Sequence, residues 1–205
     1  MDYGESMAKG FAPAAARNRE PILEVLRRVL PAEGVVLEIA SGTGEHSAFY
    51  SAALPSLVWQ PSDQAGDALE SIRAWVEDAN RANLLPPLVL DVMRTPWPLE
   101  RADALLCINM IHISPWDATE SLFAGAERLL SVGSPLITYG PYRVSGQHTA
   151  ASNAAFDESL RSRNPRWGVR DLDELGALAQ RSGFALDDRV DMPANNMTLI
   201  WRRVG

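Results

Sequence analysis

The chain has 205 residues, of which 46% are hydrophobic, and its formal net charge is -7. A chain of this length is most simply one domain, residues 1–205, and it can bury about 70% of its unfolded surface in one core. The acidic residues are scattered and there is no Lys/Arg block, which argues against a broad nucleic-acid surface. We therefore expect a small-molecule partner and no nucleic acid.

Cysteine usage and the absence of long apolar runs suggest a compartment. The only cysteine, Cys107, lies in the apolar run "ALLCINMI", so a disulfide within the chain is impossible and a buried, inert thiol is expected. No segment has the pattern of a signal peptide or the length of a membrane span. Three histidines and one cysteine without close spacing predict no metal site. These features favour a cytoplasmic protein without membrane contact.

Apolar runs alternate with segments of helical period, which predicts an α/β fold with a mostly parallel, doubly wound sheet. The turn "PANN" between the last two apolar runs predicts an antiparallel C-terminal hairpin. In chain order we predict a helix at 19–30, a strand at 35–40, a helix at 45–54, a strand at 56–60, a helix at 66–80, strands at 87–92 and 103–111, a helix at 114–130, a strand at 135–140, helices at 151–163 and 172–182, and strands at 184–192 and 197–203.

Helix ends carry their own signals. Ser114 can cap the helix that follows the fourth strand, with Pro115 in its first turn and Asp117 completing a weak capping box. Asp171 opens the last helix and Gly183 ends it.

The segment "VLEIASGTGEHSAFY" joins an apolar strand to a turn of small residues and then to a helix. Gly42 and Gly44, with Ala40 and Ser41, let a ligand approach the backbone closely, although a merely tight turn is the alternative. A dinucleotide site requires G-x-G-x-x-G/A, and Ser47 occupies the third position, so an NAD-dependent oxidoreductase is the less favoured reading. The leading helix and the form E-x-A-S-G-T-G resemble the first motif of class I S-adenosylmethionine-dependent methyltransferases.

That resemblance implies S-adenosylmethionine as cofactor and gives each strand end a role. Ligands of such sheets bind beyond the carboxyl ends of the strands, where the winding reverses. We expect Asp63 to accept hydrogen bonds from the ribose hydroxyls and Asp91 to meet the adenine amino group, with Val92 flanking the ring. Asn109 and Met110 should lie near the methionine part or the methyl group. Both aspartates could instead be turn or helix caps.

Further cofactor contacts are expected from residues that precede the Gly turn in the chain. Glu38, a carboxylate inside an apolar strand, needs hydrogen bonds, and either backbone amides of the turn or the amino group of the cofactor would supply them. Arg17 and Asn18 precede the first predicted helix and could fold over the cofactor carboxylate. The alternative is an exposed N-terminus with Asn18 as its cap.

The resemblance extends over nearly the whole chain. The segments "RNREPILEVL", "LEIASGTGEH" and "MPANNMTLIWRR", with the whole stretch from Gly140 to Leu175, resemble the uncharacterised methyltransferase-like 26 group. This implies the seven-strand Rossmann-like methyltransferase fold with the last strand inserted antiparallel. It supplies no substrate.

Acceptor chemistry should come from the fourth and fifth strands and from the long stretch between Pro141 and Arg170. We predict His112 and Tyr142 as catalytic residues, while a hydrogen bond across the loop is the alternative for His112 and packing is the alternative for Tyr142. The run "SGQHTAASN" is expected to begin a cover over the cofactor, anchored by Phe156 and Leu160. Other candidates for this side are Tyr139, His148, Ser152, Asn153, Asn195 and Asn196.

The leading hypothesis is thus an S-adenosylmethionine-dependent methyltransferase that acts on a small molecule. The first alternative is a protein of the same fold that binds S-adenosylmethionine or S-adenosylhomocysteine without turnover, because the cofactor motifs of the two are the same.

Overall fold

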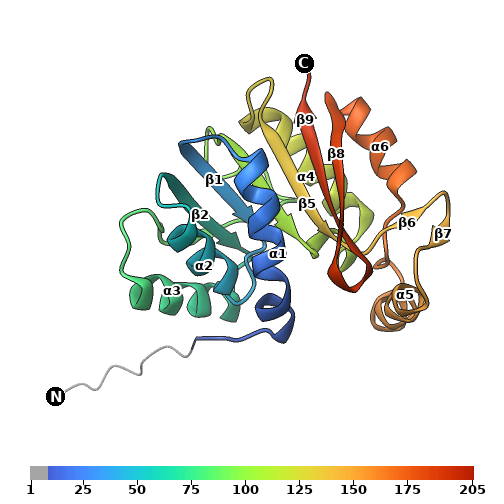
Figure 1. Ribbon diagram of the computed structural model, residues 1–205, viewed down its shortest axis with the longest axis horizontal. Coiled ribbons are helices and arrows are strands. Elements are labelled where there is room, and N and C mark those ends of the chain that lie inside the picture. The colour runs from blue at the N-terminus through green and yellow to red at the C-terminus, as the bar shows by residue number, and fades with distance from the viewer. Residues whose placement is uncertain (1–8) are drawn as a thin grey trace.

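A computed structural model describes residues 9–205 and shows a central sheet with helices on both faces (Figure 1). No helix in this part of the chain is long and apolar enough to cross a membrane. The helices are α1 (Pro13–Val29), α2 (Glu45–Ala53), α3 (Asp67–Ala79), α4 (Trp116–Leu129), α5 (Ala151–Arg163) and α6 (Leu172–Arg181), with short 3₁₀ turns at Met110–His112 and Pro193–Asn195. The strands are β1 (Gly34–Ile39), β2 (Leu57–Asp63), β3 (Leu88–Val89), β4 (Ala104–Ile108), β5 (Pro135–Gly140), β6 (Arg143–Val144), β7 (Gln147–His148), β8 (Phe184–Met192) and β9 (Asn196–Arg203).

Seven strands form the main sheet in the order β3-β2-β1-β4-β5-β9-β8. The strands from β3 to β5 are parallel, whereas β9 pairs antiparallel with both β5 and β8. The winding reverses between β1 and β4, because β2 and β3 extend the sheet on one side and β5 on the other. The predicted fold, including the inserted antiparallel last strand, is therefore confirmed.

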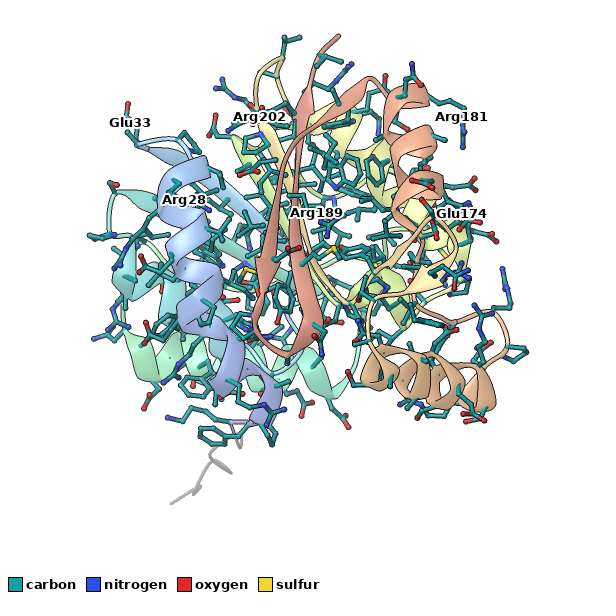
Figure 2. All side chains as sticks on the ribbon, turned by 45° about the vertical axis from the view of Figure 1, so that its right-hand side comes forward. Arg28, Glu33, Glu174, Arg181, Arg189 and Arg202 are labelled. Carbon is teal, nitrogen blue, oxygen red and sulfur yellow. The ribbon has the colours of Figure 1, made fainter. Side chains whose placement is uncertain are left out.

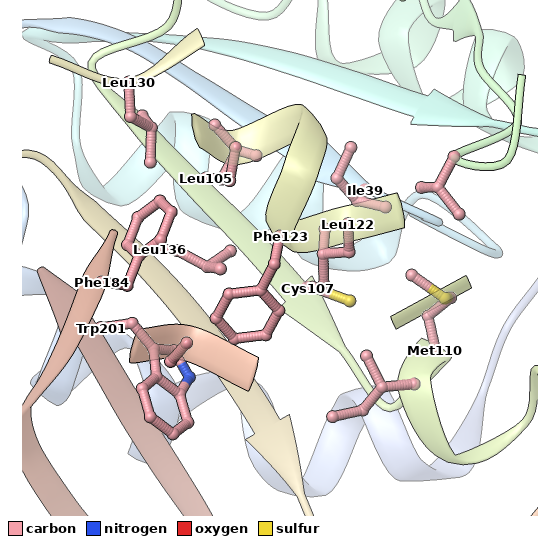
Figure 3. Packing of buried hydrophobic residues seen from close by; sticks show 14 of the residues in the cluster. Ile39, Leu105, Cys107, Met110, Leu122, Phe123, Leu130, Leu136, Phe184 and Trp201 are labelled. Atoms are coloured by element: carbon pink, nitrogen blue, oxygen red, sulfur yellow. The ribbon is translucent and has the colours of Figure 1, made fainter. Parts of the chain in front are cut away.

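Each face of the sheet has its own hydrophobic core, since successive strand residues point to opposite faces. On one face, α4 and α6 cover a core in which the Phe123 ring meets the rings of Phe184 and Trp201 edge-on, at centroid distances of 5.8 and 5.7 Å (Figure 3). On the other face, α1, α2 and α3 cover a core that includes Tyr50 and Trp59. Both faces of the parallel strands are thus buried.

Several predicted boundaries in the first part of the chain are wrong. The third strand, predicted at 87–92, is limited to Leu88–Val89, so Asp91 and Val92 follow the strand. Helix α1 begins at Pro13, where proline suits the first turn, so Arg17 and Asn18 lie inside the helix and Asn18 is no cap. The fourth strand ends at Ile108 because Asn109 adopts a left-handed conformation with φ 63°, and a 3₁₀ turn follows.

The cap predicted at Ser114 is also wrong. Pro115 holds the cap position of α4 without a side-chain bond, and the Ser114 hydroxyl donates to Met110 Sδ at 3.4 Å. By contrast, Asp171 caps α6 by accepting from the Asp173 backbone N–H, as predicted. Gly183 follows the end of α6 with φ 71°, as expected for a helix end.

The stretch between β5 and α6 is ordered as a short hairpin of β6 and β7 followed by α5, whose bounds match the prediction. Leu160 is fully buried, as expected of an anchor. Phe156 is 37% exposed, so its predicted role as a second anchor is wrong. A single side chain of α5 therefore carries most of its apolar burial.

Candidate functional site

The carboxyl ends of β1, β2, β4 and β5 meet at one edge of the sheet, because these strands are parallel. The turn after β1 needs three left-handed residues, Ala40, Gly42 and Gly44, with φ of 54°, 59° and 90°. A Cβ atom added to Gly42 would meet nothing within 4 Å. The turn therefore leaves open space beside its backbone at the point where the winding reverses.

Asp63, the last residue of β2, lies directly beside this turn. Its two carboxylate oxygens accept hydrogen bonds from the backbone N–H groups of Gly42 and Gln64, each at 2.8 Å. Burial raises the pKa of Asp63, and these two hydrogen bonds act in the opposite direction. A carboxylate offers about four acceptor positions, so acceptor capacity remains for a ligand.

Glu38 on β1 is buried, and its partners are side chains rather than the expected turn amides. Its Oε2 accepts from the Trp59 indole at 2.6 Å and from the Ser47 hydroxyl at 2.7 Å. Burial raises the pKa of Glu38 to about 7, against the effect of those two donors. Glu38 therefore holds β1, β2 and α2 together beneath the turn, and neither Trp59 nor Ser47 was anticipated as its partner.

A cavity of about 360 Å³ opens beside the ends of β2 and β3. Asp91 borders it, while its Oδ1 accepts from the Met93 backbone N–H at 3.0 Å, as a turn cap would. Val92 is 6% exposed and packs in the core instead. The lining residues are Gln64, Ala65, Val89, Leu90, Asp91, Arg94, Pro96 and Pro98.

Asn109 and Met110 follow β4 at the same edge. The Asn109 N–H donates to the Tyr139 carbonyl at 2.8 Å, which ties the ends of β4 and β5 together. Gly140 must lack a side chain here, because an added Cβ would lie 3.1 Å from Asn109 Oδ1 and 2.4 Å from His112 Nε2. Ser41 is likewise held at this edge, since its backbone N–H donates to the carbonyl of Ser62 at 2.9 Å.

His112 and Tyr142, the predicted catalytic pair, contact each other with ring centroids 5.0 Å apart, and both are fully buried. His112 Nδ1 accepts from the Arg170 N–H at 3.2 Å, and burial lowers the His112 pKa to about 3. The Tyr142 hydroxyl donates to Thr138 at 3.0 Å, and burial raises the Tyr142 pKa far above its ordinary value. This geometry favours packing, and a catalytic role for either residue stays a prediction.

Several other predicted polar residues do come together. Asn153 on α5 donates to the carbonyl of Asn195 at 2.9 Å, and the Asn195 amide donates to Ser152 at 3.3 Å. These bonds place α5 beside the turn between β8 and β9, at the lower edge in Figure 1. His148 lies apart, 3.5 Å from Asp157.

A second polar group surrounds Tyr139 at the end of β5. Burial raises the Tyr139 pKa, while Asn18, Arg17 and Asn196 act in the opposite direction. Asn18 also bonds His46 Nε2 at 2.8 Å. His46 was not among the predicted residues, and only its place in the first turn of α2, after Gly44, could have indicated it.

The segment before α1 also packs against the Gly turn, which sequence reasoning missed. Gly10 N–H donates to Ser71 at 2.7 Å, and the Ser71 hydroxyl donates to the Thr43 carbonyl at 2.6 Å. The Ala12 N–H donates to Glu45 in the first turn of α2. Residues 9–12 thus border the candidate site, whereas no group of three or more metal-ligating side chains occurs in residues 9–205.

This strand order, with a Gly turn after β1 and an acid at the end of β2, defines the class I methyltransferase fold. The sequence model of the family described as "Protein of unknown function (DUF938)" matches residues 9–203, and the chain belongs to this family.

Similar solved structures support the fold. An O-methyltransferase family protein from Burkholderia thailandensis is 16% identical with a TM-score of 0.79, over 94% of this chain and 58% of that one. An O-methyltransferase family 2 protein from Planctomyces limnophilus, in complex with apigenin, is 19% identical with a TM-score of 0.78, over 93% and 60%. CalO1, a methyltransferase in calicheamicin biosynthesis in its SAH-bound form, is 17% identical with a TM-score of 0.73, over 93% and 55%. The chain thus spans between 55% and 60% of the length of these proteins.

Proposed function

We propose that the protein binds S-adenosylmethionine and transfers its methyl group to a small molecule. The observation that carries the proposal is the position of Asp63 against the backbone of Gly42, at the reversal of winding and beside an open cavity. A carboxylate and exposed turn backbone at this point suit a nucleoside ligand. Methyltransferases of the same fold, one of them with S-adenosylhomocysteine bound, support this assignment, and the likeness to the methyltransferase-like 26 group is part of the proposal.

Each side of the ligand has a proposed contact. The ribose hydroxyls donate to Asp63, and adenine occupies the cavity bordered by Asp91. The methionine part lies along the turn of Ala40, Ser41, Gly42 and Gly44, toward Asn109 and Met110. Arg17 and Asn18, which reach this edge from α1, face the cofactor carboxylate, and Glu38 supports the turn from below.

Methyl transfer from a sulfonium is an in-line displacement: the acceptor forms a bond to the methyl carbon as the carbon–sulfur bond breaks. The cofactor supplies the chemical drive, and this chain's residues orient the two reactants and remove a proton where the acceptor carries one. The polar group of Asn18, His46, Tyr139 and Asn196 is placed to hold a small acceptor between α1 and β9.

A second candidate function is binding of the same cofactor without turnover. It is favoured by one observation: His112 is fully buried and its pKa is lowered to about 3, so it is a weak base. His46 has a pKa lowered to about 4, mainly by burial, and is similarly weak. An acceptor that needs no base, such as a thiolate or an amine, would be compatible with transfer.

Thermal unfolding and calorimetric titration with S-adenosylmethionine, S-adenosylhomocysteine, NAD and NADP test the proposal. A ligand at 100 times its Kd adds about 2.7 kcal/mol of stability, or about 5 to 10 °C. Asp63→Ala should weaken the binding of S-adenosylhomocysteine by about 10- to 150-fold, because it removes hydrogen bonds to a charged acceptor.

Glu77→Ala, at an exposed position on α3, is the matched control and should bind like the parent. Stabilisation by NAD alone, or unchanged binding by a folded Asp63→Ala protein, would overturn the assignment. Production of S-adenosylhomocysteine in the presence of candidate acceptors separates transfer from binding alone.

A further inference from the structure

A second cavity in the described part of the chain lies away from the candidate cofactor site. It has a volume of about 520 Å³, and its lining contains four arginines and one carboxylate. This is an unusual concentration of positive charge in a chain whose net charge is -7. The lining residues are Trp116, Arg143, Arg161, Arg170, Glu174, Ala177 and Arg181, which together we call the arginine cavity.

The arginine cavity is built by four elements, α4, β6, α5 and α6, together with Arg170 just before α6. Arg143 on β6 and Arg170 just before α6 are joined through their backbones, since the Arg143 N–H donates to the Arg170 carbonyl at 2.9 Å. Glu174 and Arg181 come from α6, and Figure 2 shows both on the outer side of that helix. None of the lining residues also borders the cavity beside Asp91. The two cavities are therefore separate sites.

The Arg170 side chain is fixed in place. Its Nε donates to the Ile111 carbonyl at 2.8 Å, its Nη2 donates to the Ser114 carbonyl, and its guanidinium lies over the Trp116 ring at 5.6 Å. These partners are neutral, so its charge is not cancelled by them. Burial lowers the Arg170 pKa, and the charge of Arg161 acts in the same direction.

The other guanidinium groups also lack full compensation. Arg143 Nη2 lies 3.8 Å from Glu174 Oε2, which is longer than a hydrogen bond, and Arg143 Nε is buried without a hydrogen-bond partner within residues 9–205. Arg161 bonds Asp157 at 3.0 Å, but Asp157 also faces His148. Arg181 forms no ion pair in the described part of the chain. A buried polar group without a partner is costly, so a ligand acceptor here would be stabilising.

We propose that the arginine cavity binds the phosphate group of a small phosphorylated molecule. A phosphate monoester has a charge of about -1.5 to -2 near neutral pH and three acceptor oxygens, which matches several guanidinium groups around one space. Guanidinium groups bind such oxygens in a bidentate manner, and these bonds are stronger than neutral ones. The volume leaves room for a small organic group attached to the phosphate. The alternative is a solvated, charged surface that binds nothing.

Calorimetric titration with inorganic phosphate and with glycerol 3-phosphate, at constant ionic strength, tests this proposal without any use of S-adenosylmethionine. Arg181→Gln, at an exposed position, and Arg143→Gln should each weaken the binding of both probes at least tenfold. Glu174→Gln removes the only carboxylate of the lining and should tighten them several-fold, because it removes repulsion. Arg28→Gln, at an exposed position on α1, is the matched control and should bind like the parent.

Equal loss of binding in Arg28→Gln and Arg181→Gln would show nonspecific charge attraction and would overturn the proposal. So would the absence of binding to the folded parent, or binding of malonate as tight as that of phosphate. Protein saturated with S-adenosylhomocysteine should bind phosphate with unchanged affinity. Competition between the two would place phosphate in the cofactor site and overturn a separate one. Failure of cofactor binding would leave the phosphate result intact, so the two proposals fail independently.

Discussion

The region from β1 to β3 and the region from β6 to α6 hold charged side chains of opposite sign in different surroundings. In the first, acidic groups are paired with neutral donors: Glu38 with Trp59 and Ser47, and Asp63 with backbone N–H groups. In the second, Arg170 donates to neutral carbonyls, Arg161 pairs with Asp157, and Arg143 Nε has no hydrogen-bond partner in the described chain. We therefore expect hydrogen-bond donors of a ligand at the first region and acceptors at the second.

The largest expected effect concerns Glu38, and it tests whether the carboxylate in the first region is in fact buried at a cost. Its folded pKa of about 7 lies above its ordinary value of 4.5, so the folded state retains a proton that the unfolded state has lost. Stability from this group is present below pH 4.5 and is lost as the pH rises through 7, by about 3 kcal/mol. The Gln side chain of Glu38→Gln cannot ionise. The free energy of unfolding of this variant, relative to that of the parent, should therefore increase by that amount between pH 4.5 and 8.

Urea unfolding of both proteins at several pH values measures this difference. His46 and His112 have lowered pKa values of about 4 and about 3, so their contributions increase stability as the pH rises toward 6.5. Both histidines are present in parent and variant, and the difference between the two curves isolates Glu38. Parallel curves would mean that Glu38 keeps its ordinary pKa.

A smaller effect compares two buried tryptophans, one in each core. The Trp59 indole donates to the Glu38 carboxyl, whereas the Trp201 indole donates to the Thr138 hydroxyl at 3.1 Å. Replacement of either tryptophan by Phe removes a similar amount of packing. The lost hydrogen bonds differ, because those to charged groups contribute about 1.5–3 kcal/mol and neutral ones about 0.5–1.5 kcal/mol. Trp59→Phe should therefore cost about 1 kcal/mol more than Trp201→Phe at pH 8.

The same pair of variants contains its own control. At pH 4.5 the Glu38 carboxyl is protonated in the folded state, so the excess cost of Trp59→Phe should decrease. An excess cost that is independent of pH would show that it arises from packing rather than from the carboxylate.

Some of the structure follows from local sequence pattern. The run "PLITYG" and the hairpin of β8 and β9 are marked by continuous apolar residues and by turn chemistry, so their predicted bounds agree with the structure. That Gly42 and Asp63 lie close together could also be predicted from the sequence, because parallel neighbouring strands end at one edge of the sheet.

The rest depends on contacts between distant residues, which no local pattern reports. The four arginines of the arginine cavity are spread between Arg143 and Arg181 without forming a charged run, and tertiary packing alone brings them together. The partners of Glu38 are similar, since Trp59 reaches it from the neighbouring strand. The sequence left open whether His112 and Tyr142 face the site or are held within the fold, because a residue at a strand end can point to either side of the edge.

The last expected effect compares two helix starts, one predicted correctly and one wrongly. Asp171 accepts from the Asp173 N–H at 2.9 Å and from the Gly146 N–H at 2.7 Å, so it joins the β6–β7 hairpin to α6 beside the arginine cavity. Asp171→Ala should cost about 1 to 2 kcal/mol, as for other helix caps. Ser114→Ala should cost less than about 0.5 kcal/mol, because its hydroxyl bonds a weak acceptor, Met110 Sδ, and caps no helix. Urea unfolding checks both, and equal costs would mean that the Asp171 bonds add nothing. If Asp171→Ala also weakens phosphate binding while it remains folded, the hairpin that carries Arg143 is held in position by this cap.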